Sequence, residues 1–415
     1  MAVNSADLVV GFAGLTSAGI VAAAAAASKG VRAIAFDGDI TRTAALRRGE
    51  LPIDEPGLKS LIESNRERIE YTATAADLSQ CALVYVFIDT PADENGQRDL
   101  SLLKTFFRDV AAASRADAVL VLIGPIPPGC TRAHVPKGRS VFYQAQAAST
   151  GRSVEQALEP KQLIIGCADP VAPLPAPLAA HLAAFDCPIL RMRYESAELA
   201  RVALDMLLAS SISVVHTLTE LCEKTGADWA EIVPTLKAET SFAPALSFSE
   251  ELERDLAGAL TLAERHAVDG GVIEAYLASN RRRRDWLLQR LEEHVLARTP
   301  DARLALVGAR PDDKSTVAAL LAALPKLKVR IYAPEMPLEG LPNGAAESAS
   351  DPLEACAQAD ALVILAPCPE VAALDLAAMA ERMRGRVIID PYRVLDPETV
   401  KRAELAHHVL GRGSS

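Results

Sequence analysis

The sequence has few aromatic residues, no excess of positive charge and no closely spaced cysteines. Aromatic residues make up only 4% of the 415 residues, so we expect a core built mainly from Ala, Leu, Val and Ile. The net charge of -11 implies no broad basic surface, which argues against nucleic acid as a partner. Because the seven cysteines form no CxxC pair and no Cys/His cluster, we expect no metal site and reduced thiols, as in a cytoplasmic protein.

The sequence also lacks a recognisable leader and a long uninterrupted apolar run. Its N-terminus has no basic region followed by an apolar one, and the longest apolar run, residues 20–27, is too short to cross a bilayer. We therefore expect a soluble intracellular protein with no membrane partner.

Short apolar runs alternate with helical patterns in two separate parts of the chain. Strands are expected at residues 8–13, 31–37, 83–88, 118–124, 163–167, 188–192, 304–307, 329–332, 362–366 and 387–390. Continuous apolar strands separated by helices indicate parallel sheets covered on both faces. Between the two parts, residues 196–225 contain no proline or glycine and predict one long helix, and a second helical segment is expected at about 250–298.

These patterns predict an α/β protein with two Rossmann-like, doubly wound parallel-sheet domains joined by a long central helix and a helical region. The expected domains are residues 1–194, 195–299 and 300–415.

A glycine motif follows the first expected strand. Gly14-Leu-Thr16-Ser-Ala-Gly19 has the G-x-G-x-x-G spacing except at Thr16, opens a helix, and is followed by Asp37 at the end of the next strand. This context is typical of a dinucleotide site, and the acid favours NAD over NADP. Thr16 stands at the middle glycine of the motif, where its side chain either blocks the diphosphate of the cofactor or offers its hydroxyl as a hydrogen-bond donor. The alternative is a turn between strand and helix that binds no nucleotide.

Several longer segments resemble the UDP-glucose/GDP-mannose dehydrogenases. They are Leu46–Leu58 (LRRGELPIDEPGL), Val86–Ser101 (VFIDTPADENGQRDLS), Pro125–Arg132 (PIPPGCTR), Leu158–Gly166 (LEPKQLIIG), Ser196–Asp228 (SAELARVALDMLLASSISVVHTLTELCEKTGAD) and Val387–Glu398 (VIIDPYRVLDPE). The resemblance implies an N-terminal NAD domain, a central helix that forms a homodimer and a C-terminal domain that binds a nucleotide sugar. It also implies oxidation of the sugar C6 alcohol to a carboxylate by two hydride transfers to NAD, through an intermediate held on a cysteine.

The residues expected to hold the cofactor combine the glycine motif with the resemblance. They are Gly14, Thr16, Ala18, Gly19, Asp37 and Thr90.

The catalytic positions that the resemblance implies carry other residues here. The cysteine falls on Glu251, and the lysine and asparagine of the central helix fall on Arg201 and Asp205, which can pair at i, i+4. Two glutamates of another family motif fall on Gln146 and Thr150. Only the family's later aspartate and asparagine remain, as Asp255 and Asn280.

Three hypotheses follow from these substitutions. The first is a catalytically degenerate homologue that acts as a binding, regulatory or partner subunit, for example in surface polysaccharide synthesis. The second is an active NAD-dependent oxidoreductase that performs one hydride transfer on an altered substrate, with Asp255 or Asp205 as the base. The third is an active family dehydrogenase in which the catalytic residues align differently.

Overall fold

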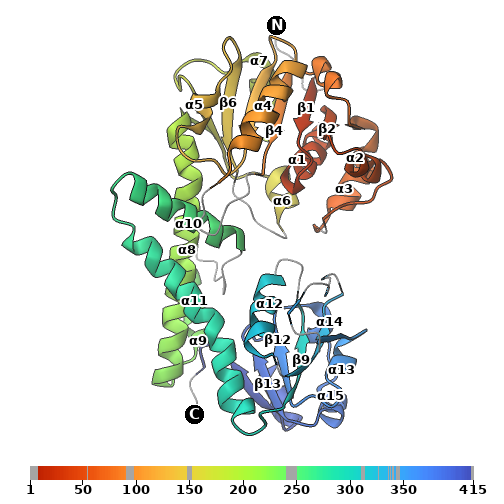
Figure 1. Ribbon diagram of the computed structural model, residues 1–415, viewed down its shortest axis with the longest axis vertical. Coiled ribbons are helices and arrows are strands. Elements are labelled where there is room, and N and C mark those ends of the chain that lie inside the picture. The colour runs from red at the N-terminus through yellow and green to blue at the C-terminus, as the bar shows by residue number, and fades with distance from the viewer. Residues whose placement is uncertain are drawn as a thin grey trace. The chain divides into compact units, whose positions relative to one another are not determined.

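The computed structural model describes residues 8–412 except for short internal segments. The segments outside the described residues are 54, 90–97, 147–151, 240–249, 310–313, 326, 335, 337, 339–340 and 343–345. The chain forms two compact units (Figure 1), here called the N-terminal unit (Met1–Met206 with Arg254–Asp269) and the C-terminal unit (Leu207–Glu253 with Gly270–Ser415). The three expected domains remain a prediction.

The N-terminal unit contains an eight-stranded sheet. In spatial order the strands are β3 (Ile69–Thr72), β2 (Arg32–Phe36), β1 (Val9–Ala13), β4 (Leu83–Phe87), β5 (Val119–Ile123), β6 (Ser140–Ala145), β7 (Leu163–Cys167) and β8 (Ile189–Arg193). All neighbours are parallel except β6 and β7, which pair antiparallel. The doubly wound sheet is confirmed, and strands β3 and β6 are additions to the expected set.

Alternate residues of these strands pack on opposite faces of the sheet. Val10 and Phe12 of β1 join the alanines of α1 (Ser17–Ser28) in one cluster, whereas Val84 of β4 joins Phe107 of α4 (Ser101–Ala113) in another. Both faces are therefore buried, which explains why central strands such as β4 and β5 are apolar at every position. The other α-helices of residues 40–183 are α2 (Ile40–Arg47), α3 (Leu58–Asn65), α5 (Cys130–His134), α6 (Ser153–Leu158) and α7 (Ala176–Ala183).

The C-terminal unit contains a second, smaller parallel sheet. Its strands, in spatial order, are β11 (Ala346–Ser348), β10 (Lys328–Tyr332), β9 (Arg303–Val307), β12 (Ala361–Ile364), β13 (Val387–Asp390) and β14 (Ala406–Val409). The α-helices between and after these strands are α12 (Lys314–Ala323), α13 (Pro352–Ala355), α14 (Pro369–Ala372), α15 (Leu376–Arg382) and α16 (Pro397–Arg402). Buried clusters lie on both faces of this sheet too, so the second Rossmann-like architecture is confirmed.

The helical region begins with α8 (Tyr194–Thr225), which matches the expected long helix, and continues with α9 (Trp229–Glu239). The segment expected to be helical over about 250–298 is interrupted. It forms α10 (Glu250–Arg265) and α11 (Gly271–Leu291), followed by a π-helix at Glu292–Leu296. Ala267 adopts φ 53° between the two helices, which ends the first of them.

Among the described residues, α8 alone is long and apolar enough to cross a membrane by length and composition. The longest uninterrupted apolar run, residues 20–27, did not point to α8, because the apolar residues of α8 are interspersed with polar ones. A single such helix is weak evidence for a span, since long helices in protein cores have the same composition.

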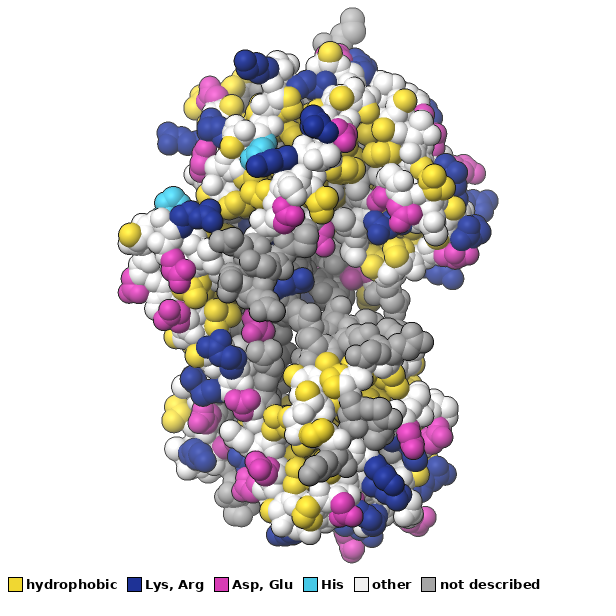
Figure 2. Space-filling view, in the orientation of Figure 1, with side chains coloured by type: hydrophobic (Ala, Val, Ile, Leu, Met, Phe, Trp, Pro, Cys, Tyr) yellow, Lys and Arg dark blue, Asp and Glu magenta, His cyan; other side chains and the backbone are white. Residues whose placement is uncertain are grey.

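Positive and negative side chains are interspersed over the face of the molecule drawn in Figure 2. No broad field of Lys and Arg covers that face, as expected for a chain with a net charge of -11.

Two histidines stack in the C-terminal unit. The rings of His294, in the π-helix, and His408, in β14, lie with centroids 3.7 Å apart and planes 16° apart. Burial is the main cause that lowers the pKa of His408 to about 4, and the nearby His294, Arg290 and His407 lower it further, against an opposing effect of Glu293. Stacked imidazoles at this distance cannot both carry a positive charge without strong repulsion.

We expect the C-terminal unit to lose stability as the pH falls from about 6.5 to about 4. In this range His408 binds a proton in the unfolded chain but not in the folded one, and this difference favours unfolding. The stability that depends on neutral His408 is therefore complete above pH 6.5 and is lost as the pH falls to about 4. The expected loss is about 1–2 kcal/mol, because the imidazole is only part-buried. Both tryptophans, Trp229 and Trp286, lie in this unit, so urea unfolding followed by tryptophan fluorescence reports on it.

The matched variant is His408→Phe, which keeps the ring stack and removes the titrating group. Its stability should change less over the same pH range. The same pH dependence in both proteins would show that His408 does not cause the loss of stability at low pH.

Candidate active site

The glycine motif forms a tight backbone turn between β1 and α1. Gly14 adopts φ +92°, and a Cβ at this position would lie 2.2 Å from the carbonyl oxygen of Phe87. A Cβ at Gly19 would lie 2.1 Å from the carbonyl oxygen of Gly14. Both positions therefore require glycine, the first for the turn and the second for close packing of helix and strand.

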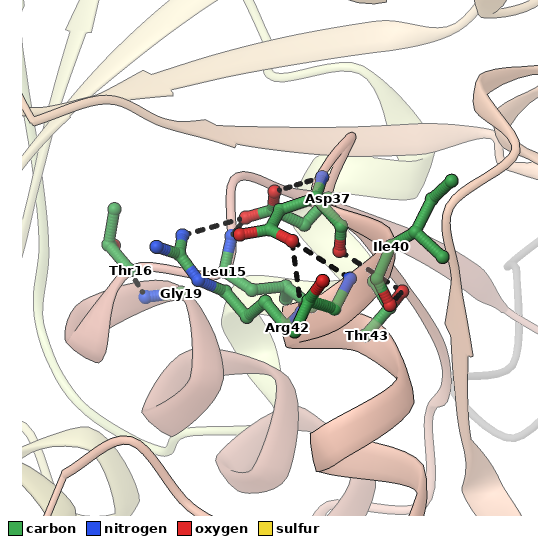
Figure 3. Close-up of polar contacts among 9 residues, drawn as sticks. Leu15, Thr16, Gly19, Asp37, Ile40, Arg42 and Thr43 are labelled. Carbon is green, nitrogen blue, oxygen red and sulfur yellow. Dashed lines mark hydrogen bonds and ion pairs between the residues drawn. The ribbon is translucent and has the colours of Figure 1, made fainter.

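Thr16 is the N-cap of α1. Its hydroxyl oxygen accepts a hydrogen bond from the backbone N–H of Gly19 at 3.2 Å (Figure 3). The side chain thus satisfies one of the N–H groups that a helix start leaves without a partner. Within the described part of the chain, the N–H groups of Ser17 and Ala18 make no hydrogen bond, so they remain as donors for an anion.

Asp37 connects the end of β2 to this turn. One carboxylate oxygen accepts from the backbone N–H of Leu15 at 2.9 Å and from the Arg42 guanidinium at 3.1 Å (Figure 3). The other oxygen accepts from the backbone N–H of Asp39 at 2.9 Å. A carboxylate has about four lone-pair positions, so Asp37 retains capacity for a ribose hydroxyl.

The structure therefore brings together all but one of the expected cofactor residues. Gly14, Thr16, Ala18, Gly19 and Asp37 lie around the start of α1, and Thr90 lies outside the described residues. Arg42 was missed by the sequence analysis, although an arginine in the first turn of the helix after the acid was the available signal.

A second polar cluster in the N-terminal unit contains the implied catalytic positions. The Arg201 guanidinium, on α8, contacts the Asp255 carboxylate of α10 at 2.5 Å and donates to the backbone oxygen of Gln146 at 2.6 Å. Arg98 contacts the other oxygen of Asp255. The Arg201 and Asp255 side chains are only 9% and 8% exposed, so this is a buried, paired set of charges.

The expected pairing of Arg201 with Asp205 is present, but at 3.9 Å it is longer than the contact with Asp255. Glu251 lies in the first turn of α10, and its side chain is outside the described residues, as is all of Thr150. In the C-terminal unit, Asn280 is buried and donates to Glu253 at 3.2 Å. Arg98 was also missed, because nothing in its local sequence predicts a contact with a residue so far along the chain.

The seven cysteines are all described, and none has the environment of a reactive thiolate. Burial raises the pKa of Cys130 to about 11 and those of Cys81 and Cys356 to about 12. Burial likewise raises the pKa of each remaining thiol. A nucleophilic cysteine needs the opposite shift, because the thiolate is the attacking species.

Models of one family match three segments of the chain. The NAD-binding domain of the UDP-glucose/GDP-mannose dehydrogenase family matches residues 9–173, its central domain 195–282 and its UDP-binding domain 314–397. The chain belongs to this family. The glycine turn, Asp37 and the Arg201–Asp255 cluster all lie within or beside the first two segments.

Two UDP-glucose 6-dehydrogenases are similar to this chain over nearly its whole length. UDP-glucose 6-dehydrogenase TuaD of Bacillus subtilis is 23% identical over 95% of this chain and 91% of its own. UDP-glucose 6-dehydrogenase of Pseudomonas aeruginosa is 26% identical over 95% of each chain. Among solved structures, a UDP-glucose dehydrogenase from Pyrobaculum islandicum matches with a TM-score of 0.82 and 20% identity over 98% of each chain. These comparisons support the family fold and an NAD-binding domain.

We expect Thr16→Gly to raise the affinity for NAD about tenfold. The change frees the N–H of Gly19 and removes a branched side chain from the turn, while glycine at an N-cap costs only a few tenths of a kcal/mol in helix stability. Calorimetric titration with NAD measures the effect. Thr16→Ser is the matched control, because it keeps the hydroxyl that caps α1; equal NAD affinity in all three proteins would mean that Thr16 does not limit binding.

Proposed function

We propose that this family member holds a dinucleotide but does not oxidise a sugar alcohol to a carboxylate, and that it acts as a binding, regulatory or partner subunit. The observation that carries the proposal is that Glu251 stands where the resemblance implies the nucleophilic cysteine. Burial raises the pKa of all seven thiols, so none has the environment of a substitute nucleophile. Arg201, where the resemblance implies a lysine, is held by the Asp255 carboxylate at 2.5 Å.

The chemistry needs two groups that this cluster does not supply. An aldehyde is oxidised through a covalent intermediate only if a thiolate adds to its carbonyl carbon, and the position implied for that thiol is Glu251. The oxyanion that forms must then be stabilised by donors and positive charge, and loss of one such donor typically costs 10²–10³-fold in kcat, by order of magnitude. Asp205, where the family has an asparagine, adds negative charge beside Arg201 instead.

Retention of the cofactor site is supported by the geometry at the start of α1. The turn keeps the two glycines that its backbone contacts demand, and Asp37 remains at the end of β2. The N–H groups of Ser17 and Ala18 face no acceptor among the described residues, as an anion site requires. NAD is therefore the cofactor that we expect, with the affinity limited by Thr16.

A homodimer through α8 is part of the same proposal. Leu207, Val214 and Leu221 recur at intervals of seven residues and are 65%, 52% and 51% exposed. Side chains at this spacing form one apolar stripe along a helix, which a second copy of the helix would cover. The division into domains 1–194, 195–299 and 300–415 and a role in surface polysaccharide synthesis remain predictions.

Calorimetric titration with NAD, followed by UDP-glucose in the presence of NAD, tests the proposal. We expect heat of binding from NAD and no NADH after the sugar is added. Absence of NAD binding would contradict the dinucleotide-holding role, and NADH formed once per sugar would favour a single-step oxidoreductase instead.

A further inference from the structure

A hollow of about 210 Å³ lies beside the first residues of β9 and β10 in the C-terminal unit. Its lining includes Arg303, Lys328, Arg330, Glu347, Ala357 and Ala359. The alanines leave the space open, and three of the four charged side chains are positive.

Two of these positive side chains are neighbours and lack a counter-charge of their own. Arg303 and Lys328 are directly paired in the register of β9 and β10. Among the described residues neither side chain makes a hydrogen bond or an ion pair. Asp360, whose pKa the charge of Arg303 helps to lower, is already held by Arg384, at 2.6 Å for one contact, and by the backbone N–H of Arg303 at 2.7 Å. Like charges directly opposite each other on neighbouring strands destabilise a sheet, and an anion bound between them would reduce the repulsion.

The third cation forms a fixed wall of the hollow. Arg330 contacts Glu347 at 3.1 Å and donates to the backbone oxygens of Glu354 and Ala357 at 3.1 and 3.3 Å. Its guanidinium is therefore held in place and its charge is balanced. Arg303 and Lys328 remain as the groups that can turn toward a ligand.

The hollow lies at the opposite edge of the sheet from the usual nucleotide position. Arg303 and Lys328 begin their strands, whereas Gly308, with φ +80° and a Cβ position 2.3 Å from the oxygen of Ala366, follows the end of β9. Nucleotides in folds of this kind bind beyond the carboxyl ends of the strands.

A pair of cations without a matching carboxylate is also notable in a chain with a net charge of -11, because such a pair cannot reflect a general excess of positive charge.

We propose that this hollow binds a small phosphate-bearing anion, with Arg303 and Lys328 as its direct contacts. Its volume is below the roughly 300–1,000 Å³ of pockets for drug-sized ligands, so a phosphate or diphosphate group with a small body fits best. The site goes beyond the proposed function and does not depend on it.

Calorimetric titration of the full chain with inorganic pyrophosphate at low ionic strength tests the site. Arg303→Gln combined with Lys328→Gln should weaken binding at least about tenfold, since the charge-assisted hydrogen bonds of both side chains to the anion are lost. The matched control combines Arg382→Gln with Lys401→Gln, which removes the same charge from exposed positions of this unit and should leave binding unchanged.

Tryptophan fluorescence confirms that each variant keeps the fold of the C-terminal unit. Equal binding by the three proteins, equal weakening by both double variants, or no binding by the unmodified chain would each overturn the proposal.

Discussion

Asp255→Ala is expected to destabilise the N-terminal unit by about 3–5 kcal/mol. The substitution leaves Arg201 and Arg98 without the carboxylate that both contact, and their side chains are only 9% and 15% exposed. Water cannot readily replace that carboxylate, so less of the desolvation cost of the two guanidinium groups is offset. Scanning calorimetry measures the loss.

The matched control is Asp117→Ala in the same unit. Asp117 contacts Arg115 at 2.6 Å, but their side chains are 70% and 46% exposed. An exposed pair contributes about 0–1 kcal/mol, so this variant should melt close to the unmodified protein. Similar losses in the two variants would show that the Asp255 cluster is no more buried in solution than a surface pair.

Gly14→Ala is expected to destabilise the same unit by about 3–5 kcal/mol and to abolish NAD binding. Two separate costs add at this position, because alanine disfavours φ +92° and its Cβ would lie 2.2 Å from the oxygen of Phe87. The backbone must move to relieve that contact, and the turn that faces the cofactor moves with it.

Gly30→Ala separates the two costs. Gly30 has a similar φ of +90°, but nothing lies within 4 Å of a Cβ built there. This variant should lower the free energy of unfolding only by the part due to backbone strain, about 1–2 kcal/mol, and should bind NAD as the unmodified protein does. If Gly14→Ala were no more destabilising than Gly30→Ala, the close approach to Phe87 would not constrain the turn.

The central strands and the glycine turn could be predicted because their signals are local. Strands such as β4 and β5 are apolar at every position, and the glycine spacing and Asp37 follow from the geometry of one turn. By contrast, β3 and β14 lie at sheet edges and contain polar residues, so no apolar run marks them. Only part of each of these two edge strands is buried, which weakens the apolar pattern.

The polar cluster around Asp255 could be predicted only in part. Its i, i+4 contact between Arg201 and Asp205 follows from helical spacing, whereas the shorter contact with Asp255 depends on how α10 packs beside α8. Arg98 reaches the same carboxylate across 157 positions of sequence. Such contacts are set by tertiary structure, which no local pattern encodes.

The most direct test of the account is the release of NADH from purified protein supplied with NAD and UDP-glucose. Because Glu251 replaces the implied thiol and Asp205 the implied asparagine, we predict no NADH above the level of a protein-free control. Formation of two NADH per sugar, the yield of complete oxidation from alcohol to carboxylate, would contradict the account.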